Sequence, residues 1–333
     1  MIMNSNKILF LIILVLSTII TMSSNNWLGM WMGLEINLMS FIPLISNSKS
    51  KKSSQAMMTY FLTQSIGSIM LLFSITLPIM FSYYEFMTDL IKILILISIM
   101  IKIGAAPFHL WLPEMMTNMN WIECMILMTW QKIAPLIIMS NIMSLNWFMY
   151  LSVIMSVTVG SIGGLNQTSL RKILAYSSIN HMGWMMMFMT MNLSWYKYLI
   201  IYSLLIIMIC LFLNMKNVYF MNQLNSSSPS LMEKLTCFIL FLSMGGLPPF
   251  MGFLSKWMVI QSMMNSSMYI IMVMMMMFSL ITLFYYVRMM TSFMLSYSTM
   301  NKFVNNNMSN KLMLFMLMFT NFMLPILMTM SFF

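Results

Sequence analysis

Four ionisable residues stand inside long apolar stretches of the chain: Glu35, Lys102, Lys132 and Lys256. Only 7% of all residues are charged. A charge at the centre of a bilayer costs about 2.5–3.5 kcal/mol on insertion scales, and such residues commonly line proton or ion pathways. A buried amine can exist in neutral and charged forms, whereas a guanidinium stays charged. These residue types therefore indicate proton transfer inside a membrane.

The same four residues also have structural interpretations. Glu35 can form a structural ion pair, or it can stay neutral because burial disfavours its charge. A lysine near a helix end can extend its ammonium group to the membrane surface. That alternative stays open for Lys102 and Lys256, and it fits poorly with Lys132 at the centre of its apolar run.

Two histidines are further candidates for carrying protons. His181 lies in the segment AYSSINHMGW, where serine and asparagine surround it. An imidazole with polar neighbours can relay protons near neutral pH. The alternative for His181 is a hydrogen-bonded core histidine, and for His109 the two interpretations remain open.

The composition predicts an all-α polytopic membrane protein. Of the 333 residues, 61% are hydrophobic, and a soluble domain would carry about 25% charged residues. Apolar runs fill the chain, which leaves no room for a soluble domain of ordinary size.

The 53 methionines and five alanines are typical of an A+T-rich animal mitochondrial gene that reads an isoleucine codon as methionine. This bias concerns location and says nothing about mechanism.

Several functional classes are disfavoured. The net charge is +10, but the lysines are scattered and form no basic groove, so nucleic acid is not an expected partner. Cys124, Cys210 and Cys237 form no CxxC pair, which argues against iron–sulfur, zinc or disulfide chemistry. No phosphate-binding loop, dinucleotide fingerprint or HExxH motif occurs. We therefore expect no cofactor, no metal and no redox catalysis in this chain.

Apolar runs of about 20 residues recur and predict about 11 transmembrane helices. The predicted ranges are 7–23, 27–46, 55–82, 88–113, 121–140, 147–165, 171–191, 197–215, 234–262, 267–290 and 311–331. This count places most lysines and arginines on the side of the N-terminus, which the positive-inside rule assigns to the matrix, with the C-terminus in the intermembrane space. We expect three acids to lie in loops: Glu114, Glu123 and Glu233.

Two segments resemble each other and interrupt apolar runs. KIGAAPFHLWL at 102–112 aligns with MGGLPPFMGFL at 244–254 at an offset of 142 residues, which pairs Gly104 with Gly246 and Pro107 with Pro249, next to Pro248. Paired Gly/Pro interruptions are typical of inverted-repeat transporters, and the freed backbone groups need protein or water. We expect one transporter-like membrane domain with inverted five-helix repeats, two broken helices, approximate halves 7–140 and 147–290, and a C-terminal helix 311–331. Simple kinks in packed helices are the alternative.

Five segments together carry a resemblance to a known family: WMGLEINLMSFIPL, KIGAAPFHLWLPEMM, TWQKIAPL, GGLNQTSLRKILAYSSINHMGW and GGLPPFMGFLSKW. They closely resemble the antiporter-like chain 2 family of mitochondrial NADH:ubiquinone oxidoreductase, of the insect type. The resemblance covers most of the chain and is loose in the loops and beyond residue 265. It implies a subunit of the membrane arm in the inner mitochondrial membrane, whose channel residues map onto Glu35, Lys102, Lys132 and Lys256.

The resemblance also implies partners and a mechanism. Other membrane-arm subunits, neighbouring antiporter-like chains among them, would contact this chain, as would phospholipid such as cardiolipin. NADH, FMN, iron–sulfur clusters and ubiquinone would reside in partner subunits. Glu35 and Lys102 would form an acid–base pair, Lys132 would sit at the junction of the halves with His181 near it, and Lys256 would serve the second half. The alternatives are a stand-alone cation/proton antiporter and a structural spacer with inert charges.

Overall fold

The computed structural model describes residues 5–46, 50–80, 85–142, 147–191, 194–227, 231–299 and 311–323. These residues form helices and connections, with one isolated antiparallel bridge between Ser169 and Phe220. The prediction of an all-helical chain is therefore confirmed for the described residues. The chain divides into two compact units, Met1–Phe148 and Met149–Phe333, and each is described by itself.

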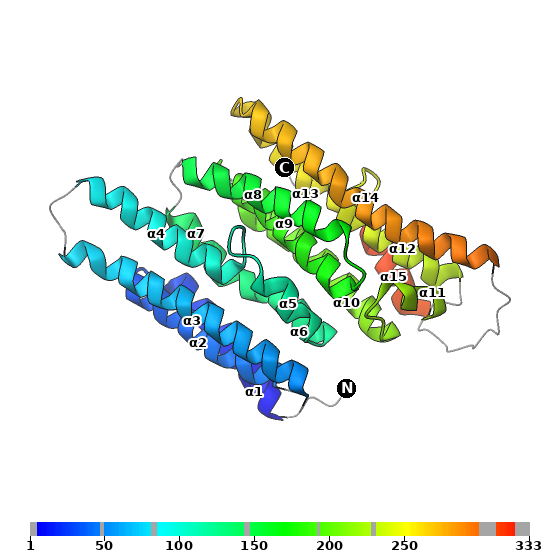
Figure 1. Cartoon of the computed structure of the whole chain (residues 1–333), viewed down its shortest axis with the longest axis horizontal. Coiled ribbons are helices and arrows are strands. Elements are labelled where there is room, and N and C mark those ends of the chain that lie inside the picture. The colour runs from blue at the N-terminus through cyan, green and yellow to red at the C-terminus, as the bar shows by residue number, and fades with distance from the viewer. Residues whose placement is uncertain are drawn as a thin grey trace. The chain divides into compact units, whose positions relative to one another are not determined.

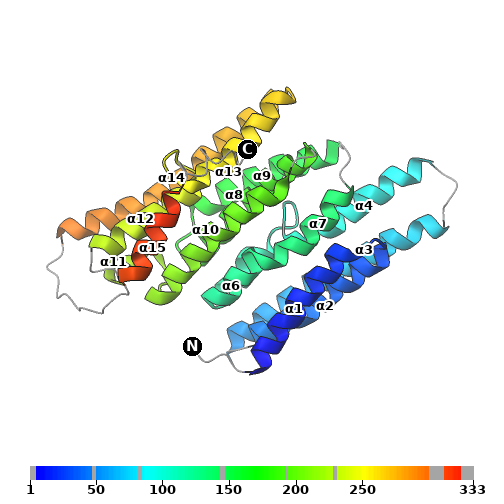
Figure 2. The ribbon, with the colours of Figure 1, turned by 180° about the vertical axis from the view of Figure 1, so that it is seen from behind.

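The first unit is built on long helices that pack in chain order. Its α1, α2 and α3 lie side by side, and α3 packs along α4 (Figures 1 and 2). Shorter helices complete it: α7 packs against α4, and α5 packs against α3. The elements are α1 (Ser5–Ser23), α2 (Trp27–Ile45), α3 (Lys51–Met80), α4 (Glu85–Ile103), α5 (Trp111–Thr117), α6 (Trp121–Met128), a 3₁₀ segment (Trp130–Lys132) and α7 (Ile133–Ile142).

The second unit surrounds a helix that is buried along almost its whole length, α9. Helices α10, α13 and α14 all contact α9, and α15 packs on α12. The elements are α8 (Trp147–Leu165), α9 (Leu170–Thr190), α10 (Trp195–Lys216), α11 (Met221–Ser227), α12 (Leu231–Gly245), α13 (Met251–Asn265), α14 (Tyr269–Thr299) and α15 (Lys311–Asn321).

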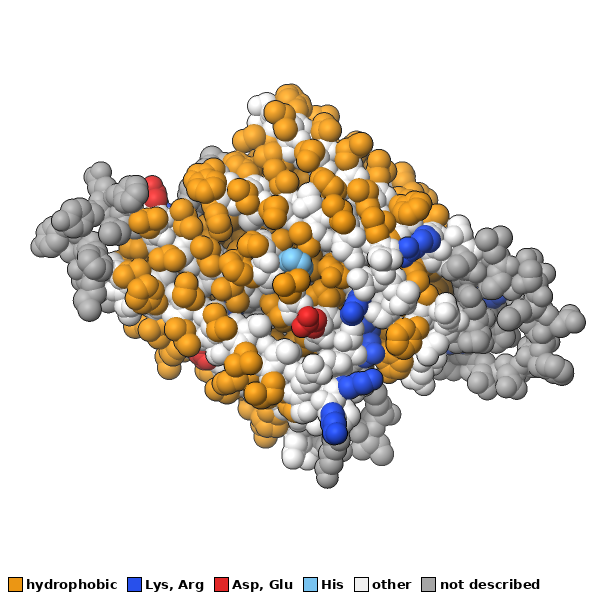
Figure 3. Space-filling view, in the orientation of Figure 1, with side chains coloured by type: hydrophobic (Ala, Val, Ile, Leu, Met, Phe, Trp, Pro, Cys, Tyr) orange, Lys and Arg blue, Asp and Glu red, His pale blue; other side chains and the backbone are white. Residues whose placement is uncertain are grey.

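The outer faces of several helices are apolar. On α14 the exposed residues Ile270, Val273, Met277, Leu280 and Phe284 recur at helical spacing and are 54–83% exposed. The face seen in Figure 3 is covered mainly by hydrophobic side chains. Such continuous apolar surface is unfavourable in water and matches a lipid environment. Seven helices of the described part are long and apolar enough to span a bilayer: α1, α2, α3, α6 with α7, α8, α10 and α14.

The predicted count of about 11 spans remains a prediction. Helices α12 and α13 have 15 residues each, which is short of the roughly 20 needed to cross the hydrocarbon layer alone. The structure also contains α11, which was not predicted, and it extends α14 to Thr299. Of the expected C-terminal helix, residues 324–331 lie outside the described part of the chain.

Both Gly/Pro segments leave the helical conformation in the same way. Gly104 has φ +76° and Gly246 has φ +80°, a left-handed conformation that glycine adopts without steric cost. After α4, Gly104 and Ala105 donate their N–H groups to the Met100 carbonyl at 3.0 and 3.1 Å. After α12, Gly246 and Leu247 donate to the Leu242 carbonyl at 3.1 and 3.4 Å. This is the glycine-terminated helix end, and it recurs at the offset of 142 residues found in the sequence.

Prolines keep the chain from resuming a helix at once. Pro107, whose peptide bond to Ala106 is cis, lies in the non-helical segment between α4 and α5. Pro248 and Pro249 lie between α12 and α13. Because proline has no N–H to donate and restricts the residue before it, these segments stay irregular until Trp111 and Met251.

A third interruption was missed by the sequence analysis. The predicted helix 121–140 divides into α6 and α7 around a 3₁₀ turn at Trp130–Lys132. Pro135 lies in the first turn of α7 and cannot donate to the carbonyl of Gln131, four residues earlier. A short 3₁₀ stretch accommodates this lost bond. Lys132 therefore lies at a break in the helix and not at the centre of a regular one.

The left-handed glycine at the second break can be tested by a pair of neighbouring substitutions. Gly246→Ala places a Cβ in the left-handed region and is expected to destabilise the protein by about 1–2 kcal/mol. Gly245→Ala is the matched control, because the atoms nearest to its Cβ would be 3.6 Å away, and alanine favours a helix over glycine by about 0.5–1 kcal/mol. The thermal unfolding midpoint in lipid nanodiscs should fall for Gly246→Ala only. Equal midpoints would contradict the assigned backbone conformation.

Candidate functional site

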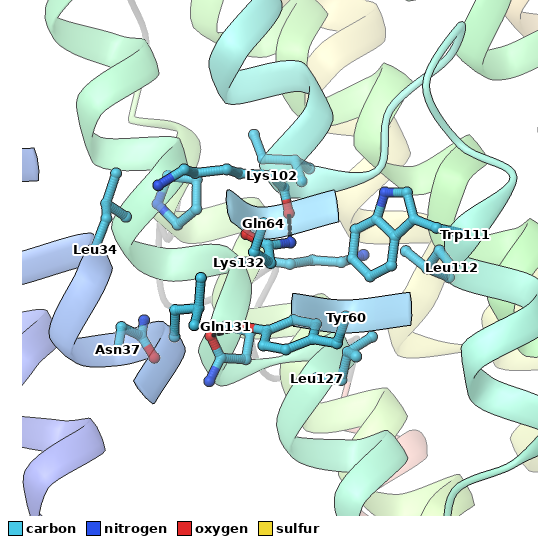
Figure 4. Close-up of a pocket in the computed structure, with 13 residues that line it drawn as sticks. Leu34, Asn37, Tyr60, Gln64, Lys102, Trp111, Leu112, Leu127, Gln131 and Lys132 are labelled. Atoms are coloured by element: carbon cyan, nitrogen blue, oxygen red, sulfur yellow. Dashed lines mark hydrogen bonds between the residues drawn. The ribbon is translucent and has the colours of Figure 1, made fainter. Parts of the chain in front are cut away.

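The first unit contains a small buried cavity lined by polar and apolar side chains from six helices and the 3₁₀ turn (Figure 4). Its volume is about 20 Å³, and on this measure roughly 10–15 Å³ is enough to hold one water molecule. Two of the predicted site lysines line it together. The lining is Leu34, Asn37, Leu38, Tyr60, Gln64, Lys102, Ile103, Trp111, Leu112, Leu127, Gln131, Lys132 and Pro135.

Lys102 reaches the cavity from the last turn of α4. It is only 6% exposed, and its backbone carbonyl accepts a hydrogen bond from Gln64 Nε2 at 3.0 Å. The lysine stem runs across Gly67 of α3, where an added Cβ would lie 2.9 Å from Lys102 Cγ. The broken end of α4 thus needs a donor from α3, and the close packing of the two helices carries the amine inward.

Lys132 enters the same cavity from the 3₁₀ turn and is 3% exposed. In Figure 4 the two amines point in opposite directions, that of Lys102 toward Leu34 and that of Lys132 toward Trp111. Neither lysine extends to a surface of the described chain, because both are buried. Extension of these ammonium groups to the membrane surface, the structural alternative, does not match this burial.

Glu35 lies on α2 beside the cavity without lining it. Its carboxyl group is close enough to Lys102 for a Coulombic interaction. No direct ion pair within 4.0 Å joins these two described side chains. Its Oε1 atom is buried and has no hydrogen-bond partner among the described residues. The carboxyl group and the amine therefore form no direct ion pair and interact through space.

Four further polar residues of this cavity were missed by the sequence analysis. The hydroxyl of Tyr60 donates to Gln131 Oε1 at 3.3 Å. Within the described part of the chain, Asn37 Oδ1 and Gln131 Nε2 are buried and have no partner. The sequence signal was present, since Tyr60 and Gln64 are one helical turn apart on α3 and an uncompensated polar group in an apolar run is costly. One acceptor and one donor without partners, beside a cavity of water size, form a site for a water molecule.

The second unit holds Lys256 at its own helix break. Its Nζ donates to the Gly245 carbonyl, the last of α12, at 2.7 Å. A Cβ on Gly246 would lie 3.0 Å from this nitrogen, so the absence of a side chain there makes room for the amine. An ammonium group is favoured at a helix C-terminus because the partial charge there is negative. Lys256 is 5% exposed.

His181 lies in α9 and is 5% exposed. Its Nδ1 is 2.8 Å from the hydroxyl of Tyr198 in α10. The ring of Tyr202, one turn further along α10, lies with its centroid 5.0 Å from the imidazole. His181 was predicted to lie near Lys132. The two residues belong to different units, and their proximity stays a prediction.

The remaining ionisable candidates have local roles. His109, between α4 and α5, is partly exposed and donates its Nδ1–H to the Pro107 carbonyl at 3.1 Å. The placement of Glu114, Glu123 and Glu233 in loops was wrong, because all three lie in helices. Glu123 caps the start of α6 by bonding to the backbone N–H of Asn120 at 3.1 Å, and Glu233 is buried in α12 and pairs with Lys216 at 2.6 Å. Both acids occupy first helical turns, where negative charge is favoured. Glu114 also lies in a first turn, that of α5, and is exposed.

The arrangement suits proton binding and exchange. In the described residues, no group of three or more His, Cys, Asp or Glu side chains gathers in a way that could hold a metal ion. The grouped side chains are amines, a carboxyl group, an imidazole, phenols and amides. All of these donate or accept hydrogen bonds, and the amines, the carboxyl group and the imidazole can also change charge.

Comparison with known proteins agrees with this chemistry. Residues 24–282 match the family described as NADH:quinone oxidoreductase/Mrp antiporter, TM. NADH-ubiquinone oxidoreductase chain 2 of Anopheles gambiae is 47% identical over 315 residues, which cover 92% of each chain. The same chain of Locusta migratoria is 43% identical over 93% of this chain and 91% of its own length.

Among solved structures, a chain of respiratory complex I from Thermus thermophilus superposes with a TM-score of 0.85 at 19% identity, covering 97% of this chain and 78% of that one. At this identity the superposition concerns the fold alone. The family match and the sequence identity to the relatives are evidence of common descent. They show that this chain belongs to the NADH-ubiquinone oxidoreductase chain 2 family within the NADH:quinone oxidoreductase/Mrp antiporter membrane proteins.

Proposed function

We propose that this chain is a proton-translocating subunit of the membrane arm of mitochondrial NADH:ubiquinone oxidoreductase. One observation carries the proposal: Lys102 and Lys132 are buried around a single water-sized cavity, with the Glu35 carboxyl group in Coulombic range of Lys102. Buried ionisable groups in a membrane protein mark ion and proton pathways. The chain is a multi-pass protein of the inner membrane, and its partners are other subunits of the membrane arm.

The physical basis of transfer in the first unit is repulsion between like charges. Two ammonium groups that border one small cavity disfavour each other. A proton that arrives at one lysine therefore favours release from the other. The carboxylate of Glu35 stabilises the charged form of Lys102, so a change in the charge of Glu35 shifts the balance between the two amines. A water molecule held by Asn37 and Gln131 would give the proton a route between them.

In the second unit Lys256 and His181 are the proposed carriers. The Lys256 amine is held at the end of α12 by the Gly245 carbonyl, and this bond is strongest when the amine is charged. Loss of the proton weakens the bond and frees the amine. Helices α4 and α12 end with the same hydrogen-bond pattern, in which the carbonyls of Met100 and Leu242 accept from the glycine and the residue after it. This likeness supports the proposal that the two units are inverted copies of one repeat.

The energy for translocation must come from elsewhere. Moving one charge against 100 mV costs about 2.3 kcal/mol. We assign the supply of this work to quinone reduction in partner subunits, where NADH, FMN, iron–sulfur clusters and ubiquinone would bind. The excess of lysine and arginine on one side supports an N-terminus in the matrix and a C-terminus in the intermembrane space.

Removing charge from the first site should abolish most pumping without preventing assembly. Glu35→Gln and Lys132→Met keep the approximate shape of each side chain but cannot exchange a proton. The expected result in the assembled enzyme is a loss of about 10-fold or more in turnover coupled to pumping. Proton uptake per NADH is measured in proteoliposomes with a pH indicator.

Matched controls for these two variants come from the same unit. Glu114→Gln replaces an exposed acid, and Lys92→Met replaces a lysine that pairs with Asp89 and whose side chain is 44% exposed. Both controls should pump normally. Normal pumping by Glu35→Gln and Lys132→Met as well would refute a proton path through this cavity and favour a structural spacer.

Lys256→Arg separates proton transfer from helix capping. Arginine keeps a cation that can donate to the Gly245 carbonyl, but it does not lose its proton. We expect Lys256→Arg to assemble and to pump as poorly as Lys256→Met. Recovery of normal pumping by arginine alone would mean that the residue only caps α12. The comparison is made on purified enzyme with equal subunit content.

A density map of the assembled enzyme that resolves ordered solvent should show one water molecule in the first cavity. It is expected about 2.7–3.2 Å from Asn37 Oδ1 and from Gln131 Nε2. In the variant Asn37→Leu this density should disappear, whereas Ser40→Ala should leave it unchanged, because Ser40 donates only to the Asn37 carbonyl of its own helix. A dry cavity in the wild-type enzyme would rule out the water route.

A further inference from the structure

Tyr198 holds a position that the proposed proton carriers do not explain. The residue is fully buried in α10, and its hydroxyl lies 2.8 Å from Nδ1 of His181. The hydroxyl of Ser255, in α13, is a hydrogen-bonding neighbour of that of Tyr198 and donates to the Gly252 carbonyl at 2.9 Å. Ser255 directly precedes Lys256. One phenol therefore stands between the imidazole of α9 and the helix that carries the second buried lysine.

The chemistry of the two groups restricts how His181 can change its charge. A neutral imidazole has one N–H and one lone pair, and a phenol has one proton to donate. When Nδ1 carries the lone pair, it accepts the proton of the Tyr198 hydroxyl in the observed hydrogen bond. A further proton can then join the ring only at Nδ1, and the Tyr198 oxygen occupies that direction.

We propose that Tyr198 is a proton-relay residue between His181 and α13. The Ser255 hydroxyl turns from the Gly252 carbonyl and gives its proton to the Tyr198 oxygen, while the original phenolic proton moves to Nδ1. The Ser255 oxygen takes up a replacement proton from the α13 side. Tyr198 ends as a neutral phenol, and the imidazole becomes an imidazolium whose Nδ1–H donates back to the phenol. The return of the proton runs through the same bonds in reverse. This inference rests on the proposed function, in which the Lys256 ammonium group is the donor on the α13 side.

A second phenol on the same helix provides a matched control. Tyr202 is also buried, at 2% exposure, and its ring lies against the imidazole. The hydroxyl at hydrogen-bonding distance from Nδ1 of His181 is that of Tyr198. Tyr198→Phe and Tyr202→Phe each remove one buried hydroxyl and keep the ring. Tyr198→Phe is the variant that removes the hydroxyl next to Nδ1.

The test measures turnover and proton uptake per NADH in the assembled enzyme. Tyr198→Phe should leave the KM for ubiquinone and the subunit content unchanged and lower kcat by about 10-fold, since a positioned proton donor contributes about 100-fold or more. Tyr202→Phe should stay close to wild type. A merely structural hydroxyl would lower subunit content or thermal stability and would not change kcat at constant KM.

A double-mutant cycle ties the effect to the imidazole. Glutamine at position 181 can accept the phenolic hydrogen bond but cannot carry a proton, so in a His181→Gln background Tyr198→Phe should cause no further loss. Normal pumping by Tyr198→Phe, or an equally large loss in the His181→Gln background, would overturn the relay.

A spectroscopic measurement covers the case in which Tyr198→Phe does not assemble. Infrared difference spectra of the wild-type enzyme on NADH addition should show linked tyrosine and imidazole bands, identified by isotope labelling and absent in His181→Gln. Their absence in the wild type would overturn the relay.

Failure of the proposed function is distinct, because it would appear as normal pumping in Lys256→Arg and Lys256→Met. Loss of pumping in those variants with normal pumping in Tyr198→Phe would reject the relay alone.

Discussion

A helix that stops inside apolar surroundings leaves carbonyl groups without donors, and this constraint underlies both sites of the protein. Each such group costs several kcal/mol when it is left unsatisfied in hydrocarbon. At the end of α4, Trp111 Nε1 donates to the Ile101 carbonyl at 3.1 Å and Gln64 donates to that of Lys102. At the end of α12, the amine of Lys256 serves the Gly245 carbonyl. Polar side chains are thus required at both breaks for structural reasons alone.

The need for donors at the helix ends also places polar side chains where ionisable groups can be held. Groups that satisfy a helix end are donors, and they keep a polar environment in which an amine can be held. In the first unit the donors come from neutral side chains, Gln64 and Trp111. Lys102 takes part at this helix end through its backbone carbonyl, as the acceptor. In the second unit the lysine itself is the donor.

The two units consequently treat their ionisable groups differently. The first places two amines around one cavity beside a carboxyl group, where charges act on one another through space. The second ties its amine to a carbonyl and its imidazole to a phenol, where direct hydrogen bonds carry the interaction. The exchange proposed for the first unit and the relay proposed for the second are therefore physically distinct.

Local properties of the chain were readable from the sequence. The apolar runs predicted the helices, and the Gly and Pro residues around Gly104 and Gly246 marked the places where α4 and α12 end, because backbone preference depends on neighbouring residues. The isolated charges identified Lys102, Lys132 and Lys256 as residues that need a polar environment. Tertiary structure decided which side chains provide that environment. Tyr60 meets Gln131 across 71 positions and Gln64 meets Lys102 across 38, and Tyr198 meets His181 only because α9 and α10 pack together. Such pairs depend on how helices pack, and no local pattern of residues encodes that packing by itself.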